Sequence, residues 1–584
     1  MNKLPILLLA FAAASCSSFK LASPDGGIQV AAVENRLDII SSEGGAQTIV
    51  LGVDKVKKAS SATTVTESYT MITGKRRECS NSARVKTFSY DGFSIEVRAY
   101  NDGVADRFIG PEPESSYIIP DGTKRWMFKQ KIDYEGVYQS YTAAETGEWS
   151  YPALVEYADG AFGLITEAGN DYGQCGSHFT AETGSDVYKV TLADAEPSSD
   201  KSAWRLIIMG GLADIVESTL VTDIAEPCAL DDISWIKPGL SAWIYWSSNR
   251  GSRDFQKVIP FIDLAAEMKW PYNLLDGGWP GMQNGGTAEE AIAYATAKGV
   301  KTNVWYNSAT TRFRPETPGT GNEMLTAESR EAEMSRIQAL GVTGIKVDFF
   351  GGDDSEMMDF YLNILKDAAR HHLLVDFHGC TLPRGWQRTY PHLMTMEAVY
   401  GAEQYNNAPF LTKAAASHNV MMTFTRNVIG PMDYTPGTFS DTQHPHITTD
   451  AHEFALPVLF ESALQHMPDR PDVYLSFSDE IKDFWTNLPT TWDDIKFLGG
   501  YPGESVIIAR QKGNKWYVAG INGTDGAKML NFDLSSLGLS SADVTLYTDS
   551  KTSEKGLDIT NSSELSYALD CRPRGGFVAV VSSK

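Results

Sequence analysis

Between residues 236 and 488 the chain repeats one pattern, a short apolar run followed by a segment with helical periodicity, and this pattern constrains the fold most. Runs such as PYNLLDGGW, VKTNVWYN and GIKVDFF are typical of strands buried on both faces. The same reasoning predicts strands at HLLVDFHG, HLMTMEAVYG, NVMMTF and DVYLSF, and a helix over residues 449 to 467. Roughly eight strands in about 240 residues match the length and rhythm of a (β/α)8 barrel.

An open, doubly wound sheet would give the same local alternation of strands and helices. Such a sheet more often carries a glycine-rich phosphate-binding turn, and the sequence contains no turn of that kind here. We therefore favour the barrel over the open sheet.

The regions on either side of this pattern are predicted to be β-domains. From residue 20 to 235, alternating runs such as KTFSYDGFSIEVRAYN are separated by turn residues, which is typical of a β-sandwich. Alternating sequences typical of strands occur again near the C-terminus, and they predict a hairpin around Lys512-Gly513-Asn514. The sequence thus predicts a multidomain α/β chain, in which a TIM barrel (236–488) stands between an N-terminal β-sandwich (20–235) and a C-terminal all-β domain (489–584).

The first residues, MNKLPILLLAFAAASCSS, are typical of a signal peptide over residues 1–18. The stretch before Cys16 also resembles a lipoprotein cleavage box, and the sequence leaves open whether this cysteine is lipidated. Outside this segment, no apolar stretch is long enough to predict a membrane span. We expect an exported protein of the periplasm or the outer-membrane surface.

The charge of the chain narrows the class of ligand. Its formal net charge is −24 and its pI is about 4.9. Such a surface repels nucleic acids and anionic membranes, so we expect neither as a partner. A neutral ligand, or a cationic one, fits better.

Polar residues follow several of the predicted strands. In a (β/α)8 barrel the loops after the strands converge at one end, where the chemistry takes place. A single carboxylate there can merely cap the next segment or pair with a base, as Asp348 could with Lys346. Several carboxylates together suit glycoside hydrolysis, in which one attacks the anomeric carbon and another protonates the leaving oxygen. The residues at these strand ends include Asp276, Trp305, Asp348, His378, Glu397, Glu403 and Arg426.

The segment HLLVDFHGCTLPRGWQRTYPHLMTMEAVYGAE, residues 372 to 403, resembles glycoside hydrolase family 97, a family of exported α-glycosidases. FTRNVIGPMDYTPGTF at 424 to 439 and LITEAG at 164 to 169 are similar to the same family and occur in the same order. This resemblance implies an N-terminal β-super-sandwich, a (β/α)8 barrel and a C-terminal β-domain.

The family has two mechanistic branches, and the resemblance indicates which one applies. Inverting members carry a catalytic Glu at the position of Gly379, whereas retaining members carry a nucleophilic Asp at the end of strand four, where this chain has Asp348. The resemblance therefore implies that Asp348 is the nucleophile and Glu403 the general acid/base. It also implies a Ca²⁺ ion whose ligands are Glu167, Glu397 and Glu403.

The function implied is that of a retaining exo-α-galactosidase, which removes terminal α-galactosides from a glycan by calcium-assisted double displacement. We expect the sugar contacts to include Asp276, Trp305, His378 and Arg426. Within the enzyme class, β-L-arabinopyranosidase and α-glucosidase activities remain open. Outside it, the alternatives are a non-catalytic glycan-binding protein and a scaffold that calcium merely stabilises. The sequence leaves the oligomeric state open.

Overall fold

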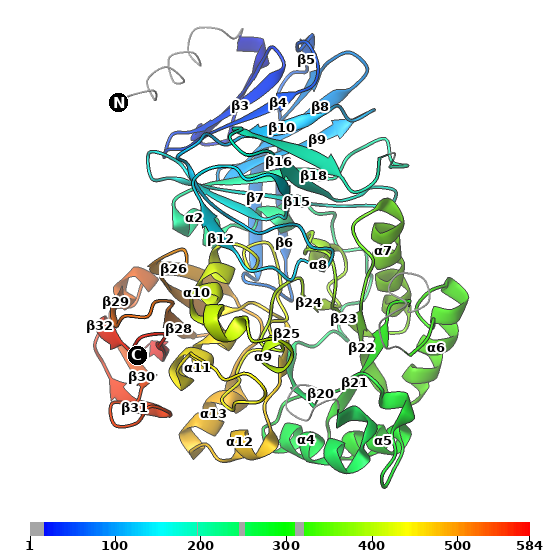
Figure 1. Cartoon of the computed structure of the whole chain (residues 1–584), viewed down its shortest axis with the longest axis vertical. Coiled ribbons are helices and arrows are strands. Elements are labelled where there is room, and N and C mark those ends of the chain that lie inside the picture. The colour runs from blue at the N-terminus through cyan, green and yellow to red at the C-terminus, as the bar shows by residue number, and fades with distance from the viewer. Residues whose placement is uncertain (1–16, 196, 245–250, 310–319, 584) are drawn as a thin grey trace.

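The computed structural model describes residues 17–195, 197–244, 251–309 and 320–583. Figure 1 shows a β-rich N-terminal part in blue and cyan above a barrel in green and yellow, with a small β-domain in orange and red beside the barrel. Cys16 and the segment before it lie outside the described residues. In the described part of the chain, no helix is both long and apolar enough to cross a membrane.

Two large antiparallel sheets make up the N-terminal part, in agreement with the predicted β-sandwich. Their strands alternate as expected when one face is covered; in β8, for example, Ile95, Val97 and Ala99 are buried and the residues between them are not. The first sheet, which a short 3-10 helix (η1, Ser17–Phe19) precedes, has the order β1 (Lys20–Ala22), β2 (Ile28–Val33), β3 (Arg36–Ser41), β4 (Ala46–Leu51), β10 (Ser115–Ile118), β17 (Val187–Leu192), β16 (Ser177–Ala181) and β13 (Gly147–Trp149).

The second sheet lies nearer the barrel, and its strand β15 carries Glu167. Two short helices, α2 (Leu212–Glu217) and α3 (Leu220–Asp223), then lead from this sheet into the barrel. The order of the second sheet is β12 (Gln139–Tyr141), β11 (Lys124–Met127), β14 (Ala153–Glu156), β15 (Phe162–Ala168), β18 (Trp204–Gly210), β9 (Gly103–Ile109), β8 (Ser94–Ala99), β7 (Glu78–Ser89) and β5 (Lys58–Ala59), and β6 (Thr63–Thr70) pairs with β7.

The central part is a parallel sheet that curls into a nearly closed barrel, so the predicted barrel is confirmed. Its strands are buried along almost their whole length, which explains their continuous apolar sequences. In the described residues this sheet has seven strands, in the order β24 (Leu393–Met396), β23 (Leu374–Phe377), β22 (Val342–Asp348), β21 (Lys301–Asn307), β20 (Tyr272–Leu275), β19 (Gly239–Trp243) and β25 (Leu464–Met467).

Helices follow most of these strands and cover the outside of the barrel. Their starts are set locally: Thr287, for example, caps α5 by a reciprocal pair of hydrogen bonds with Glu290. The helical elements are η2 (Gly251–Arg253), α4 (Phe255–Glu267), η3 (Trp279–Gly281), α5 (Ala288–Ala297), α6 (Ala327–Ala339), α7 (Ser355–Arg370), α8 (Trp386–Thr389), α9 (Gln404–Asn407), α10 (Leu411–Phe424), α11 (Asp450–Leu459), α12 (Pro471–Leu475) and α13 (Asp479–Asn487).

The late part of the barrel differs from the prediction. NVMMTF is the buried end of helix α10 and DVYLSF lies largely in helix α12, so both predicted strands are wrong. A short apolar run that is buried all round has no periodicity by which a strand can be told from a helix. The predicted helix over residues 449 to 467 is in fact helix α11 followed by strand β25, which is only four residues long.

The C-terminal domain packs around its own core, which includes Trp516, Phe532 and Phe577. The predicted hairpin is confirmed, because Gly513, with a positive φ, joins β27 to β28. The main sheet has the order β26 (Asp494–Tyr501), β27 (Ser505–Lys512), β28 (Lys515–Asn522), β33 (Gly576–Ser583), β30 (Ala542–Asp549) and β31 (Leu557–Ser562), beside a smaller pair, β29 (Lys528–Asp533) and β32 (Ser566–Cys571), and a 3-10 turn η4 (Leu534–Leu537).

Candidate active site

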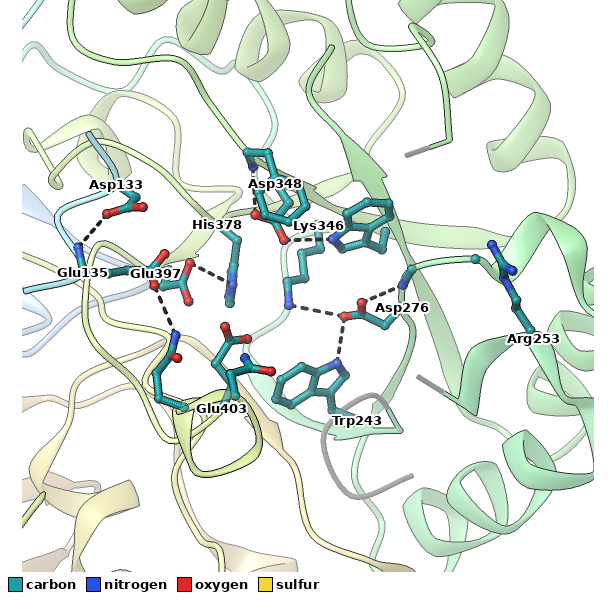
Figure 2. A pocket seen from close by; sticks show the side chains of 16 residues that line it. Asp133, Glu135, Trp243, Arg253, Asp276, Lys346, Asp348, His378, Glu397 and Glu403 are labelled. Atoms are coloured by element: carbon teal, nitrogen blue, oxygen red, sulfur yellow. Dashed lines mark hydrogen bonds and ion pairs between the residues drawn. The ribbon is translucent and has the colours of Figure 1, made fainter. Parts of the chain in front are cut away.

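A cavity of about 500 Å³ opens at the carboxyl ends of the barrel strands, a volume suited to a small ligand. Figure 2 shows Asp348 above and Glu403 below in this pocket, with Glu135 and Glu397 to the left and Asp276 to the right. The lining residues are Asp133, Glu135, Trp243, Arg253, Asp276, Gly277, Gly278, Trp305, Lys346, Asp348, Phe349, His378, Glu397, Glu403, Gln404 and Asn407.

Asp348 ends strand β22 and is held by two donors. The indole Nε1 of Trp305 donates to Oδ2 at 3.0 Å, and the backbone N–H of Phe349 donates to Oδ1 at 2.8 Å. Burial raises the pKa of Asp348, while the positive charges of His378 and Lys346 act in the opposite direction. The carboxylate is therefore fixed in orientation at the wall of the pocket (Figure 2).

Gly379 approaches this carboxylate closely, and its lack of a side chain matters. Its φ is +45°, and a Cβ built on it would lie 3.0 Å from Oδ1 of Asp348 and 3.0 Å from the backbone N of Phe349. A side chain here would be strained and would crowd Asp348. In this geometry, a carboxylic acid at position 379 and a free Asp348 compete for the same space.

Lys346 and Asp276 form an ion pair inside the pocket. The Nζ of Lys346 lies 3.3 Å from Oδ2 of Asp276, to which Trp243 Nε1 also donates at 2.8 Å. Although burial opposes its charge, Asp276 and other carboxylates raise the pKa of Lys346. The ion-pair partner of Lys346 is therefore Asp276 and not Asp348, which was the alternative, purely structural role considered for Asp348.

His378, after strand β23, lies between two carboxylates. Its Nδ1 is 3.2 Å from Oε2 of Glu397, and its Nε2 is 2.7 Å from Oδ2 of Asp433. Burial disfavours the imidazolium, but Glu397 and the other acidic groups raise the pKa of His378 well above its ordinary value. Burial also opposes the charge of Glu397. His378 and the backbone N–H of Gly379, which donates to Oε2 of Glu397 at 2.7 Å, nevertheless lower the pKa of Glu397. Glu397 is thus an ionised carboxylate.

Glu403 stands at the start of the short helix α9. Burial, with the repulsion of Glu397 and Asp348, raises the pKa of Glu403 to about 8. This carboxyl group therefore holds a proton near neutral pH, as a general acid must. Asp348 and Glu403 both line this pocket, one above and one below in Figure 2.

The N-terminal domain adds two acidic residues, Asp133 and Glu135, which the sequence analysis missed. They lie in the loop between β11 and β12, within a sandwich whose acidic turn residues give no signal of a site. Gln404 Nε2 donates to Oε2 of Glu135 at 3.2 Å. Burial and the charges of Glu397 and Asp133 raise the pKa of Glu135 well above its ordinary value.

A group of donors suited to a metal ion also lies in the pocket. One ligand atom each from His378, Glu397 and Glu403 lies within 4.8 Å of the others. Two of the three expected calcium ligands, Glu397 and Glu403, are therefore close together. The third, Glu167, does not line the pocket: its carboxylate accepts from Ser177 N at 3.0 Å and from Arg384 Nη1 at 2.7 Å.

Arg426, which was expected to contact the sugar, does not line the pocket either. Its guanidinium is buried and donates to the backbone carbonyls of Ala398, Met396 and Pro431, among others. The error follows from the mistaken strand at NVMMTF, since Arg426 follows helix α10 and not a barrel strand. Arg426 supports the loop after β24 from behind, whereas Asp276, Trp305 and His378 line the pocket as expected.

The fold and the pocket together define a glycosidase of the barrel type, because a protonated carboxyl and a second, fixed carboxylate line one sugar-sized cavity. Three family descriptions match along the chain. They are Glycosyl-hydrolase 97 N-terminal over residues 21–227, Glycoside hydrolase 97 over residues 240–399, and Glycosyl-hydrolase 97 C-terminal, oligomerisation, over residues 491–582.

Curated relatives agree with these matches. A protein of Streptomyces bingchenggensis named probable retaining alpha-galactosidase is 34% identical over 485 residues, which cover 78% of this chain and 73% of that protein. The retaining alpha-galactosidase of Bacteroides thetaiotaomicron is 28% identical over 647 aligned residues, with 94% of each chain covered. The chain belongs to glycoside hydrolase family 97.

Solved structures of the same fold include a beta-arabinopyranosidase, with a TM-score of 0.87 at 26% identity, covering 96% of this chain and 99% of that one. A glycoside hydrolase family 97 enzyme from Pseudoalteromonas sp. strain K8 in complex with acarbose has a TM-score of 0.84 at 20% identity, covering 97% and 100%. The second likeness concerns the fold alone.

Proposed function

We propose that this enzyme is a retaining exo-α-galactosidase. The observation that carries the proposal is the pair of carboxyl groups in one pocket: Glu403, with a pKa of about 8, is the acid, and Asp348 is the fixed nucleophile. The names of two relatives, both retaining alpha-galactosidases, support the same activity. Gly379, which leaves the space beside Asp348 free, supports the retaining branch over the inverting one.

In the first displacement, an oxygen of Asp348 forms a bond to the anomeric carbon as the bond to the leaving oxygen breaks. The proton of Glu403 goes to that leaving oxygen, so the aglycone departs as a neutral alcohol. Trp305 Nε1 and the backbone N–H of Phe349 each donate to one oxygen of Asp348, so the carboxylate keeps one orientation in the pocket. The product is a glycosyl ester on Asp348.

The second displacement uses the same residues in exchanged roles. Once Asp348 is an ester it carries no charge, and one of the groups that raise the pKa of Glu403 is removed. Glu403, now ionised, can take a proton from water as the water oxygen attacks the anomeric carbon and releases Asp348. Two inversions at that carbon give net retention.

We further propose that Glu397, Glu403 and Glu135 would hold a calcium ion. Their oxygens are the donors that calcium prefers, and a bound cation would relieve the mutual repulsion that raises the pKa of Glu135 and Glu403. The ion would thereby lower the pKa of Glu403, so it is the burial of Glu403 that must keep the acid protonated when the ion is bound. When bound, the ion would supply positive charge beside the leaving oxygen. We also propose export to the periplasm or the outer-membrane surface, on the basis of the N-terminal sequence.

A second activity, β-arabinopyranosidase, is favoured by one observation, the structure of that name at 26% identity. Its sugar matches galactose without the exocyclic CH₂OH group, so both activities fit the same machinery. To decide, initial rates on the p-nitrophenyl α-D-galactoside, β-L-arabinopyranoside and α-D-glucoside are compared with calcium present. We expect the galactoside to give the highest kcat/KM. A faster arabinopyranoside would make the enzyme an arabinopyranosidase, and no release from any of the three would favour a glycan-binding protein.

A further inference from the structure

The loop that brings Glu135 into the barrel pocket belongs to the other domain and has an unusual backbone. Tyr134 has a φ of +57°, which a residue with a side chain rarely adopts. A Cβ on Gly136 would lie 1.9 Å from the ring of Phe128, so only glycine fits there. The N–H of Gly136 donates to the carbonyl of Tyr134 at 2.8 Å. A conformation of this kind persists only where the surroundings hold it in place.

The side chain of Tyr134 fixes this backbone conformation, because it extends into the barrel and contacts a residue there. It is almost fully buried, and its hydroxyl donates to Oδ2 of Asp353. Asp353 lies in the loop between β22, which ends at Asp348, and helix α7. The barrel loop next to Asp348 is thus tied to the residue before Glu135.

Asp353 is in turn fixed by a buried arginine that points back to the N-terminal domain. Arg384 Nη2 donates to Oδ2 of Asp353 at 2.8 Å, and its Nη1 donates to Oε2 of Glu167 at 2.7 Å. Arg384 is 0% exposed. The contacts Glu167, Arg384, Asp353 and Tyr134 therefore cross the domain boundary twice, and we refer to these four residues as the interface chain.

Glu167 is not among the residues that line the pocket, and its contacts lie at the domain interface. Besides Arg384, its carboxylate accepts from the backbone N–H of Ser177 at 3.0 Å and from the Ser177 hydroxyl. Breaking a buried pair of this kind leaves an uncompensated charge, so each member fixes the position of the next.

We propose that the interface chain is a positioning device that holds Glu135 at the mouth of the barrel. What Glu135 does there rests on the proposed function, but its placement is a separate claim. Glu167 then acts at a distance, through Arg384, Asp353 and Tyr134, and does not itself contact a ligand.

The test is Tyr134→Phe in the full-length protein, which removes one hydroxyl and keeps the ring. Tyr188→Phe is the matched control, because Tyr188 is equally buried in the same domain and its hydroxyl bonds the charged Arg125 at 2.9 Å, away from the pocket. Amide hydrogen exchange over residues 131–138 reports the loop. Calorimetric titration of EDTA-treated protein with calcium chloride reports the pocket.

We expect exchange in this segment to be about tenfold faster in Tyr134→Phe, and its calcium affinity about tenfold weaker, with both unchanged in Tyr188→Phe. Equal exchange in the two variants would overturn the positioning claim, even if the thermal midpoint fell. If the wild type bound no calcium, the proposed metal site would fail, and the exchange comparison would still decide the placement of Glu135. Faster exchange with unchanged affinity would overturn the assignment of Glu135 as the group that the chain positions.

Discussion

Two groups of carboxylates, a buried one at the domain interface and a half-buried one in the pocket, differ in their partners. At the domain interface, Glu167 and Asp353 both pair with Arg384. In the pocket, no ion pair within the described residues joins Glu135 or Glu403 to a base, and burial raises the pKa of both. A paired carboxylate adds to the structure, whereas an unpaired one is kept for a proton or a ligand at a cost in stability.

The largest effect that this comparison predicts concerns Asp348. Asp348→Asn keeps the size and the contact with Trp305 but removes the nucleophile. We expect kcat on the p-nitrophenyl galactoside to fall by about 10⁴-fold or more, since groups that act as a unit show losses of this size. Binding of galactose, measured by calorimetry, should persist. Turnover close to the wild type would mean that another residue attacks.

Glu403→Gln should separate substrates by their leaving groups. Loss of the acid costs about 10² to 10⁴-fold for a natural galactoside, whose leaving oxygen needs a proton. An aryl galactoside with a very acidic phenol needs little protonation, so its first step should be far less affected. Kinetics on both substrates measure the difference. An equal loss on the two would contradict the role of Glu403 as the acid.

Glu167→Gln and Glu135→Gln make the same chemical change in the two regions, with opposite expected results. Glu167→Gln breaks a buried ion pair and should lower the free energy of unfolding by about 3 kcal/mol. Glu135→Gln relieves repulsion and should leave the calcium-free stability unchanged or slightly higher. Urea unfolding of both EDTA-treated variants measures this. The distinction between the regions would be lost if both variants were destabilised alike.

The smallest effect is a pH dependence of the stability of the calcium-free protein. Glu403 has a folded-state pKa of about 8 against 4.5 ordinarily, so the unfolded chain loses this proton first. The contribution of this protonated carboxyl to the free energy of unfolding is complete below about pH 4.5 and is lost as the pH rises towards 8. Thermal midpoints between pH 5 and 8 should fall less steeply for Glu403→Gln than for the wild type. Parallel curves would show that Glu403 is not buried in its protonated form.

The same contrast explains what could be predicted from the sequence. Asp348 and His378 follow apolar strands, so their place at the barrel mouth could be read from the strand pattern. Glu135 could not, since it belongs to a turn of the sandwich and approaches the pocket only through tertiary packing.

Two other residues lie outside the pocket, away from their expected places, for local reasons. Arg426 was misplaced because NVMMTF is a buried helix end, whose sequence cannot be told from that of a strand. Glu167 was recognised by a motif, but a motif does not reveal that Arg384 occupies the carboxylate.

The most direct measurement is proton NMR of p-nitrophenyl α-D-galactoside hydrolysis with calcium present, recorded before the released galactose can mutarotate. If Asp348 forms a glycosyl ester that water then displaces, the α-anomer appears first. First appearance of the β-anomer would show a single displacement by water and would contradict the assignment of Asp348 as the nucleophile.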